Sequence, residues 1–347
     1  ALLNHTVKPV IVAGVEIHRF DLQDALIHFA EKNNIPIAST LLGKSVVREN
    51  HPLYIGLYEG AIGREEVTEY VESSDCILML GTFMTDLNLG IYTANLDPRK
   101  CISATSETLE IHHHHYKDVP LDELIPELIL RNIKYCRRFI DPTVREPVSR
   151  YVIDYTAQIS IRRMIDRLNQ SLDDETIVIA DIGDSLFAST RLQTQGRTEF
   201  LSPAYYTSMG FSIPATLGAQ TAMPDHRVIT ICGDGAFQMT CLELSTIVRR
   251  GLSPIVIVLD NGGYGTERAL HPGDWGYNEI HRWSYGELTR VIGGGISHRI
   301  HTEEDFDKAL KAALADTTNM HLMHVELDRR DASETLTRLA DKMGSRV

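Results

Sequence analysis

The sequence has no apolar run long enough to cross a membrane, and its basic residues are in the minority. No stretch approaches the roughly 18 consecutive apolar residues that suggest a membrane-spanning helix. The chain has 34 Lys and Arg residues against 47 Asp and Glu residues, and its formal net charge is −13. Nucleic acids and anionic membranes are bound by basic surfaces. The sequence therefore predicts neither of them as a partner.

Cysteine is also scarce, and its spacing indicates no disulfide framework. The five cysteines include no CxxC pair, and their number is odd. No secretory segment is recognisable at the start of the sequence. We therefore expect reduced thiols and a cytoplasmic protein. Cys76 and Cys232 lie within or beside apolar runs, which favours buried thiols.

The rest of the composition is that of an ordinary globular protein, with 43% hydrophobic and 23% charged residues. A chain of 347 residues is expected to form two domains. The alternation of apolar and amphipathic runs lapses in a polar, proline-containing stretch near residues 132–150. We expect domains at 1–140 and 151–347, joined by a linker at 141–150. Because a strand follows soon after Ala1, without an initial Met, we also expect the C-terminal part of a longer protein.

Short apolar runs alternate with amphipathic helical stretches in both halves, which is typical of parallel α/β folds. Strands are predicted at residues 10–13, 36–39, 76–80, 100–104, 176–180, 228–232, 254–259 and 321–327. Helices are predicted at residues 22–33, 64–73, 159–172, 213–222, 241–250 and 303–315. The first strand ends at Gly14, but the residues that follow are not a GxGxxG motif. A nucleotide site is therefore not expected there.

Two predicted strands end in loops that combine glycine with oxygen ligands. Gly233, Asp234 and Gly235 follow the strand at 228–232, and Asn261 follows the strand at 254–259. Ligands of open parallel sheets bind beyond the carboxyl ends of the strands. Glycine allows close approach to a phosphate group, and hard oxygen donors suit Mg²⁺. The two motifs together predict a site for Mg²⁺ and a phosphate; the alternative is two tight turns.

The same residues carry a family resemblance. Gly233-Asp234-Gly235, with Asn261 twenty-seven positions after Asp234 (261 − 234 = 27), resembles the signature of thiamine diphosphate enzymes. The resemblance implies Mg²⁺ ligands from the Asp234 carboxylate, the Asn261 side chain and the Gly263 backbone carbonyl. Asp260 stands where the family usually has another asparagine. This extra acid either alters metal affinity or faces the helix layer.

Within that family, the segment 263–268 resembles the corresponding segment of pyruvate and indolepyruvate decarboxylases. The runs 180–185 and 210–215 lie upstream and the run 270–285 downstream, in the order of the same subfamily. The resemblance covers nearly the whole chain. It implies an α/β fold of two Rossmann-like domains, each a parallel sheet flanked by helices. They would be the middle domain and the diphosphate-binding domain of the thiamine enzymes.

The resemblance also implies residue roles. Glu267 would be the active-site acid that handles protons in a dry pocket. Met209 would lie under the cofactor and bend it, and Thr207 would offer its backbone carbonyl to the aminopyrimidine ring. Gly265 and Thr266 depart from the subfamily at positions that bear on substrate preference. The remaining cofactor-binding residues would be Gly183, Asp184, Gly233, Asp234, Gly235, Ala236, Asn261, Gly263 and Tyr264.

The implied activity is the Mg²⁺- and thiamine diphosphate-dependent conversion of a 2-oxo acid to an aldehyde and CO₂. An aromatic substrate such as indolepyruvate or phenylpyruvate is favoured. We find no counterpart of the family's N-terminal pyrimidine-binding domain, which supplies an essential glutamate. That domain, on the same or a separate chain, is an expected partner, within a homodimer or homotetramer. The alternatives are an acetolactate-synthase-like carboligating enzyme and a catalytically incomplete cofactor-binding fragment or regulatory remnant.

A run of four histidines, His112 to His115, is the one short low-complexity tract. The decarboxylases have a catalytic histidine pair, but it belongs to their pyrimidine-binding domain. The run in this sequence follows a predicted strand of the first domain. We therefore expect a solvent-facing strand or loop, with adventitious metal binding as the alternative.

Overall fold

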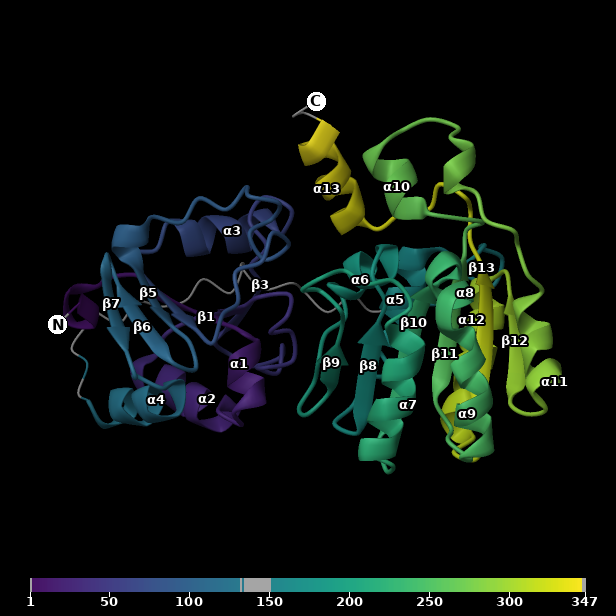
Figure 1. The fold of residues 1–347 in the computed structure, drawn as a ribbon, viewed down its shortest axis with the longest axis horizontal. Coiled ribbons are helices and arrows are strands. Elements are labelled where there is room, and N and C mark those ends of the chain that lie inside the picture. Colours follow the sequence, from purple (N-terminus) through teal and green to yellow (C-terminus); the bar gives the residue numbers. More distant parts are fainter. Residues whose placement is uncertain (1, 132, 134–150, 345–347) are drawn as a thin grey trace. The chain divides into compact units, whose positions relative to one another are not determined.

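The computed structural model describes residues 2–131, 133 and 151–344 (Figure 1). The chain divides into two compact units, Ala1–Val148 and Ser149–Val347, called here the N-terminal unit and the C-terminal unit. Each unit is built on a sheet of its own. The predicted linker at 141–150 lies outside the described residues. No helix in the described part of the chain is both long enough and apolar enough to cross a membrane.

The N-terminal unit contains a seven-stranded sheet in the order β3-β2-β1-β4-β5-β6-β7. The strands are β1 (Pro9–Ala13), β2 (Ile37–Ser39), β3 (Tyr54–Leu57), β4 (Cys76–Leu80), β5 (Cys101–Ala104), β6 (Thr108–Ile111) and β7 (His114–Lys117). The helices are α1 (Val15–Arg19), α2 (Gln23–Asn33), α3 (Glu65–Glu72) and α4 (Leu121–Leu130). Every residue of β1 is buried, as expected for a strand covered on both faces.

The C-terminal unit contains a six-stranded sheet in the order β12-β13-β11-β10-β8-β9, with all pairs parallel. The strands are β8 (Thr176–Ala180), β9 (Glu199–Leu201), β10 (Arg227–Gly233), β11 (Ile255–Asp260), β12 (Ile296–Ile300) and β13 (His321–Glu326). The helices are α5 (Ile161–Leu168), α6 (Asp184–Ser189), α7 (Ser212–Ala222), α8 (Asp234–Thr240), α9 (Leu244–Arg249), α10 (Gly265–Leu270), α11 (Leu288–Ile292), α12 (Glu303–Ala315) and α13 (Glu334–Gly344).

Apolar side chains from three helices and the central strands form the main core of the C-terminal unit. Ile213 of α7, Phe237 of α8 and Leu244 of α9 pack with Val256 and Val258 of β11. These residues are fully buried, and burial of such side chains is the main stabilising contribution to the fold. The core therefore holds α8 and β11 firmly together. Figure 1 shows α10 and α13 side by side, near the start of α6.

The structure confirms the α/β fold and the predicted strands, with three corrections. The first sheet is mixed, because β6 and β7 form an antiparallel hairpin at its edge. The helix predicted at 159–172 is shorter, because Ile159 donates its N–H to the His301 carbonyl at 2.9 Å and stays extended. The helix predicted at 241–250 starts as a 3₁₀ turn, Cys241–Glu243, before α9. Short strands at the sheet edges and the helices α1, α4, α6, α8, α10, α11 and α13 were not predicted.

The histidine run lies on the surface, as predicted. His112 and His113 form the turn of the β6–β7 hairpin and His114 and His115 begin β7, with all four exposed. His115 pairs with Glu110 at 2.8 Å. Among the described residues, no group of three or more His, Cys, Asp or Glu side chains is arranged to hold a metal ion. Of the described cysteines, Cys76 and Cys232 are buried free thiols, as expected.

Candidate functional site

The predicted site residues gather at the carboxyl edge of the C-terminal sheet. Strand β8 has β9 on one side and β10 on the other, so the chain reverses its direction of winding between β8 and β10. In open parallel sheets, ligands bind beside such a reversal. Three aspartates stand at this edge: Asp181 directly after β8, Asp234 directly after β10, and Asp260 as the last residue of β11.

Asp234 joins the two predicted loops. Its side chain is buried, with a relative exposure of 1%. Oδ1 accepts the Gly235 N–H at 2.7 Å, while Oδ2 accepts the N–H groups of Gly262 at 2.8 Å and Gly263 at 3.0 Å. Burial, with the nearby charge of Asp260 adding to it, raises the pKa of Asp234 to about 6. A bound cation would favour the ionised carboxylate.

Asn261 has a buried oxygen atom with no partner. Its Oδ1 has no hydrogen-bond partner among the described residues. Leaving such an atom unsatisfied costs about 1–3 kcal/mol. The Asn261 amide nitrogen lies so close to Gly265 that a Cβ on residue 265 would approach it to 2.6 Å. The donor set here, a carboxylate, an amide oxygen and a backbone carbonyl, has the chemistry that Mg²⁺ prefers.

Two glycines of the motifs are required by close contacts. Gly263 has φ +147°, and a Cβ on it would lie 2.1 Å from the Asn278 carbonyl oxygen. A Cβ on Gly235 would lie 2.6 Å from Cε1 of Tyr264. The Tyr264 ring therefore packs directly over the Gly235 backbone. Gly235 lets the loop after β11 pack against the start of α8, and Gly263 lets the same loop pack against Asn278.

A side chain at Gly233 would meet only an ordinary van der Waals contact. A Cβ on this residue would come no closer than 3.8 Å to any described side chain or backbone, and the nearest atom is Ser185 Oγ. Ala236 lies in the first turn of α8 and is buried. Gly183, with φ +92°, lies beside Thr266, because its Cβ would be 3.2 Å from Thr266 Oγ1. The structure thus brings the loop after β8 next to α10.

The Asp184 carboxylate is engaged within the chain. Asp184 begins α6, and its Oδ2 accepts the Ser333 N–H at 2.8 Å. Its Oδ1 accepts a hydrogen bond from the Ser333 hydroxyl. Ser333 directly precedes α13, so Asp184 fixes the start of that helix. Burial raises the pKa of Asp184 to about 6.

Thr207 and Met209 lie on a loop at the same edge. Thr207 has φ 60°, a left-handed conformation, and donates its N–H to the Pro203 carbonyl at 2.8 Å. Met209 is 38% exposed. Asp181, which we did not predict as a site residue, is fully buried and accepts the Gly210 N–H at 3.1 Å. An acid directly after a buried strand and two positions before Gly183 was the sequence signal for it.

Glu267 lies in the first turn of α10 and is exposed. Its backbone carbonyl accepts the His271 N–H at 2.9 Å. The described residues therefore do not bury this acid, although a dry pocket was expected around it. Enclosure of Glu267 would require a further surface.

The sequence left two alternatives for Asp260, an effect on metal affinity or a position facing the helix layer. In the structure its carboxylate is paired with other side chains. Its Oδ2 pairs with His324 Nε2 at 2.8 Å, and its Oδ1 pairs with Arg282 Nε at 3.3 Å. Burial acts to raise the pKa of Asp260, but the hydrogen bond with His324 and the charge of Arg282 outweigh it, so this pKa lies below its usual value. The extra acid is an ionised group paired inside the chain.

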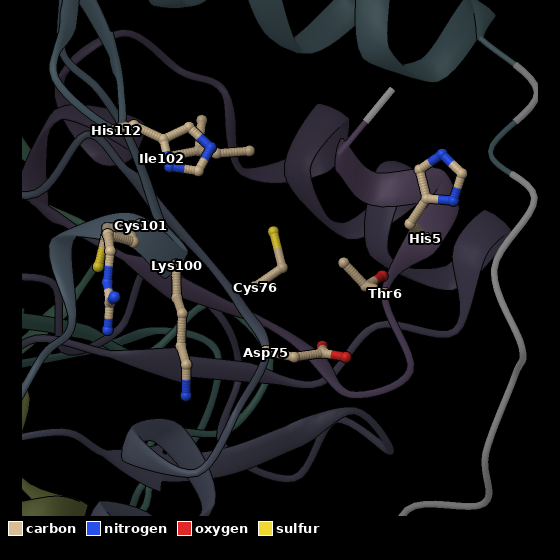
Figure 2. Close-up of a pocket in the computed structure, with 9 residues that line it drawn as sticks. His5, Thr6, Asp75, Cys76, Lys100, Cys101, Ile102 and His112 are labelled. Atoms are coloured by element: carbon tan, nitrogen blue, oxygen red, sulfur yellow. The ribbon is translucent and has the colours of Figure 1, made fainter.

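The N-terminal unit contains a pocket of about 190 Å³ at the amino ends of β4 and β5. Figure 2 shows Asp75 and Cys76 there, with Lys100 directly before β5 and Cys101 at its start. The Asp75 carboxylate already accepts the N–H groups of Val7 at 2.6 Å and Lys8 at 2.9 Å. This pocket lies at the edge opposite to the one at which parallel sheets bind ligands. It is therefore a weaker candidate than the carboxyl edge of the other sheet.

Comparison with known families decides what the two units are. Residues 1–129 match the model of the thiamine pyrophosphate enzyme central domain, and residues 181–325 match that of the C-terminal TPP binding domain. The chain belongs to the thiamine pyrophosphate enzymes. Thiamine pyrophosphate is another name for thiamine diphosphate. The match 181–325 contains β10 and β11, whose carboxyl ends carry the candidate site.

Curated relatives extend the comparison over nearly the whole chain. The chain is 29% identical over 97% of its length to an indole-3-pyruvate decarboxylase of Azospirillum brasilense, covering 62% of that protein. It is 29% identical over 96% of its length to an alpha-keto-acid decarboxylase of Mycobacterium tuberculosis, covering 60% of it. Pyruvate decarboxylase 1 of Pisum sativum is 30% identical over 100% of the chain, which covers 59% of that relative. The chain thus spans about three fifths of the length of these relatives.

Proposed function

We propose that the chain provides the diphosphate- and metal-binding part of a Mg²⁺-dependent 2-oxo acid decarboxylase that uses thiamine diphosphate. The observation that carries the proposal is the buried Oδ1 of Asn261, which has no hydrogen-bond partner among the described residues. The next residue, Gly262, donates its N–H to the Asp234 carboxylate. A hard cation at this position would satisfy the oxygen and stabilise the buried carboxylate. The names of the relatives, all decarboxylases of 2-oxo acids, support the reaction class.

Within this proposal the residues divide into three groups. Asp234, Asn261 and the Gly263 carbonyl would hold Mg²⁺, and the loop at Gly233 would receive the diphosphate. When bound, the cofactor supplies the electron sink that makes loss of CO₂ possible. Glu267 would hold and move the protons of the reaction at its carboxyl group, which requires that water be excluded around it.

The exposure of two proposed site residues supports a further covering surface. Met209 is 38% exposed and Glu267 is exposed, although both would face the cofactor or the substrate. We propose that a pyrimidine-binding domain, on the same or a separate chain, covers them within a homodimer or homotetramer. An aromatic 2-oxo acid remains the favoured substrate, supported by the indole-3-pyruvate decarboxylase among the relatives.

Calorimetric titration of the chain with thiamine diphosphate, in the presence and absence of Mg²⁺, tests the binding half of the proposal. The titration is repeated after adding the isolated pyrimidine-binding domain of a related decarboxylase. Binding that requires Mg²⁺ supports the site. Binding of equal strength without Mg²⁺ contradicts the metal assignment, and no binding under either condition contradicts the cofactor site.

Product analysis with the assembled sample tests the reaction. Pyruvate, phenylpyruvate and indolepyruvate are supplied separately, and aldehyde, acetohydroxy acid and CO₂ are quantified. Release of aldehyde and CO₂ supports a decarboxylase, with faster turnover of the aromatic acids supporting the substrate proposal. Acetohydroxy acid as the main product would instead indicate a carboligating enzyme. Mg²⁺-dependent binding without any product would indicate a non-catalytic cofactor-binding protein.

A further inference from the structure

Asp260 is placed against the predicted metal loop, 261–263, without forming part of the predicted ligand set. It is 3% exposed. Its Oδ1 accepts the Gly262 N–H at 3.1 Å and contacts Arg282 Nε at 3.3 Å. Its Oδ2 is 2.8 Å from His324 Nε2. Both Asp260 oxygens contact basic side chains, Arg282 and His324, whereas among the described residues the Asp234 oxygens accept only backbone N–H groups. Asp260 is therefore suited to hold the loop rather than to bind the metal.

The sheet register explains the contact with His324. In the pairing of β11 with β13, Val258 is opposite His324 and Asp260 is opposite Glu326. Side chains two positions apart on a strand point to the same face. Asp260 and His324 therefore share a face on neighbouring strands. Tyr285, fully buried, packs edge-on against the His324 ring with a centroid distance of 5.1 Å, which restricts the orientation of that ring.

The loop is held from both sides. The Gly262 N–H is shared between Asp234 Oδ2 at 2.8 Å and Asp260 Oδ1 at 3.1 Å. On the other side, Arg268 donates to the Gly262 carbonyl at 2.8 Å and to the Asn261 carbonyl at 3.2 Å. A Cβ on Gly262 would lie 2.7 Å from Arg282 Nε, so the Arg282 side chain also packs on the loop backbone. Gly262 has φ +75°, a conformation that needs such support when the residue next to it must present a ligand.

We propose that Asp260, oriented by His324 and Arg282, is a positioning residue that holds the loop 261–263 so that Asn261 Oδ1 and the Gly263 carbonyl face the metal. The inference deepens the proposed function and rests on it for the identity of the metal. It also gives a role to the aspartate that departs from the family signature. Groups that orient metal ligands contribute measurably to metal affinity without touching the ion.

Hydrogen–deuterium exchange of the full chain without cofactor measures the positioning directly. In His324→Leu, the amides of Gly262 and Gly263 should exchange about tenfold faster than in the unmodified chain, because Asp260 loses the partner that orients it. The matched control is His321→Leu. His321 lies at the other end of β13, is 1% exposed and pairs with Asp316 at 3.2 Å. Its loss should leave both glycine amides unchanged.

Two further variants keep the inference testable if His324→Leu does not fold. His324→Gln retains an N–H donor and should restore slow exchange. Arg282→Ala removes a side chain that is 54% exposed, so the fold should persist, and exchange at Gly262 should rise about threefold. Arg290→Ala is its control, since Arg290 is 80% exposed and pairs with a neighbouring acid, Glu287, on the surface.

Calorimetry measures the effect of the same variants on metal affinity. In His324→Leu, the Mg²⁺ concentration that half-saturates thiamine diphosphate binding should rise about 10- to 100-fold, while His321→Leu should match the unmodified chain. Equal exchange at Gly262 and Gly263 in the two leucine variants would overturn the inference. Faster exchange in His324→Leu, in a chain that binds no cofactor under any condition, would retain the positioning role and reject the proposed function.

Discussion

Both sheets have central parallel strands and a point at which the winding reverses, but they differ at their carboxyl edges. In the N-terminal unit the winding reverses between β1 and β4, and there a Cβ on Gly14 would lie 2.1 Å from the Gly81 carbonyl oxygen. The Gly81 carbonyl also accepts the Glu16 N–H at 3.1 Å. Backbone therefore fills the place where a ligand would bind. In the C-terminal unit, by contrast, a Cβ on Gly233 would lie 3.8 Å from the nearest described atom.

One polar side chain at each edge illustrates the difference. In the N-terminal unit, the Glu16 carboxylate accepts the Ser106 N–H at 2.9 Å and the Ser106 hydroxyl at 3.1 Å. In the C-terminal unit, Asn261 Oδ1 is buried with no hydrogen-bond partner among the described residues. A parallel sheet supplies the edge, whereas the loop residues decide whether that edge is closed or remains able to bind a ligand.

The largest expected effect is on cofactor binding by Asp234→Ala. This change removes a proposed metal ligand that also accepts three backbone N–H groups, so Mg²⁺-dependent binding of thiamine diphosphate should weaken at least about 100-fold. The control is Asp75→Ala in the N-terminal unit, where Asp75 also holds two backbone N–H groups. Calorimetry should show unchanged binding for that control. Mg²⁺-dependent binding retained by Asp234→Ala would refute the metal assignment.

A pair of alanine substitutions separates packing from binding. In both Gly263→Ala and Gly14→Ala the new Cβ would lie 2.1 Å from a backbone carbonyl oxygen. Each should lower the free energy of unfolding of its own unit by about 1–3 kcal/mol or more. Urea denaturation measures this loss, and calorimetry should show weaker cofactor binding for Gly263→Ala alone. A comparable loss of binding in Gly14→Ala would mean that the edge of the N-terminal unit also contributes to the site.

Asp184 should give the C-terminal unit a pH dependence. Its pKa is about 6 when folded against an ordinary value of 3.8, so between these values the folded chain binds more protons than the unfolded chain. The free energy of unfolding should therefore fall as the pH rises from about 4 to about 6. The contribution is about 3 kcal/mol at most.

Urea denaturation of Asp184→Asn across this pH range checks the contribution. The difference between the variant and the unmodified chain should change with pH in the C-terminal unit only, since the Asp184 carboxylate bonds to Ser333 of that unit. A constant difference across the range would show that Asp184 keeps an ordinary pKa in the folded chain.

The smallest effect on binding is expected for Glu267→Gln. Glu267 is exposed at the start of α10, and the substitution preserves its size, so cofactor affinity should change by less than about threefold. In the sample assembled with a pyrimidine-binding domain, turnover should nevertheless fall by about 10²- to 10⁴-fold. Steady-state assays of aldehyde release measure this. Full turnover would remove Glu267 from the proposed proton-handling role.

The central strands and the motif positions were predictable because their signals are local. Buried parallel strands such as β10 and β11 are continuous apolar runs, and glycines with oxygen ligands follow them directly. The edge hairpin β6–β7 was not predictable in this way, because exposed strands such as His114–Lys117 carry no apolar pattern. The position of Ile159 outside the helix depends on a contact with a distant residue, His301.

The sequence by itself determined that the loops after β10 and β11 would meet at the candidate site. Two apolar strands that pair in parallel, each ending in a glycine-containing loop, bring Asp234 and Asn261 to one edge. The tertiary structure alone decided how the acids there are used. Asp260 is paired with His324, which is 64 positions away, and Asp184 with Ser333, which is 149 positions away. Strand register and chain crossovers create such contacts, and neither leaves a local pattern in the sequence.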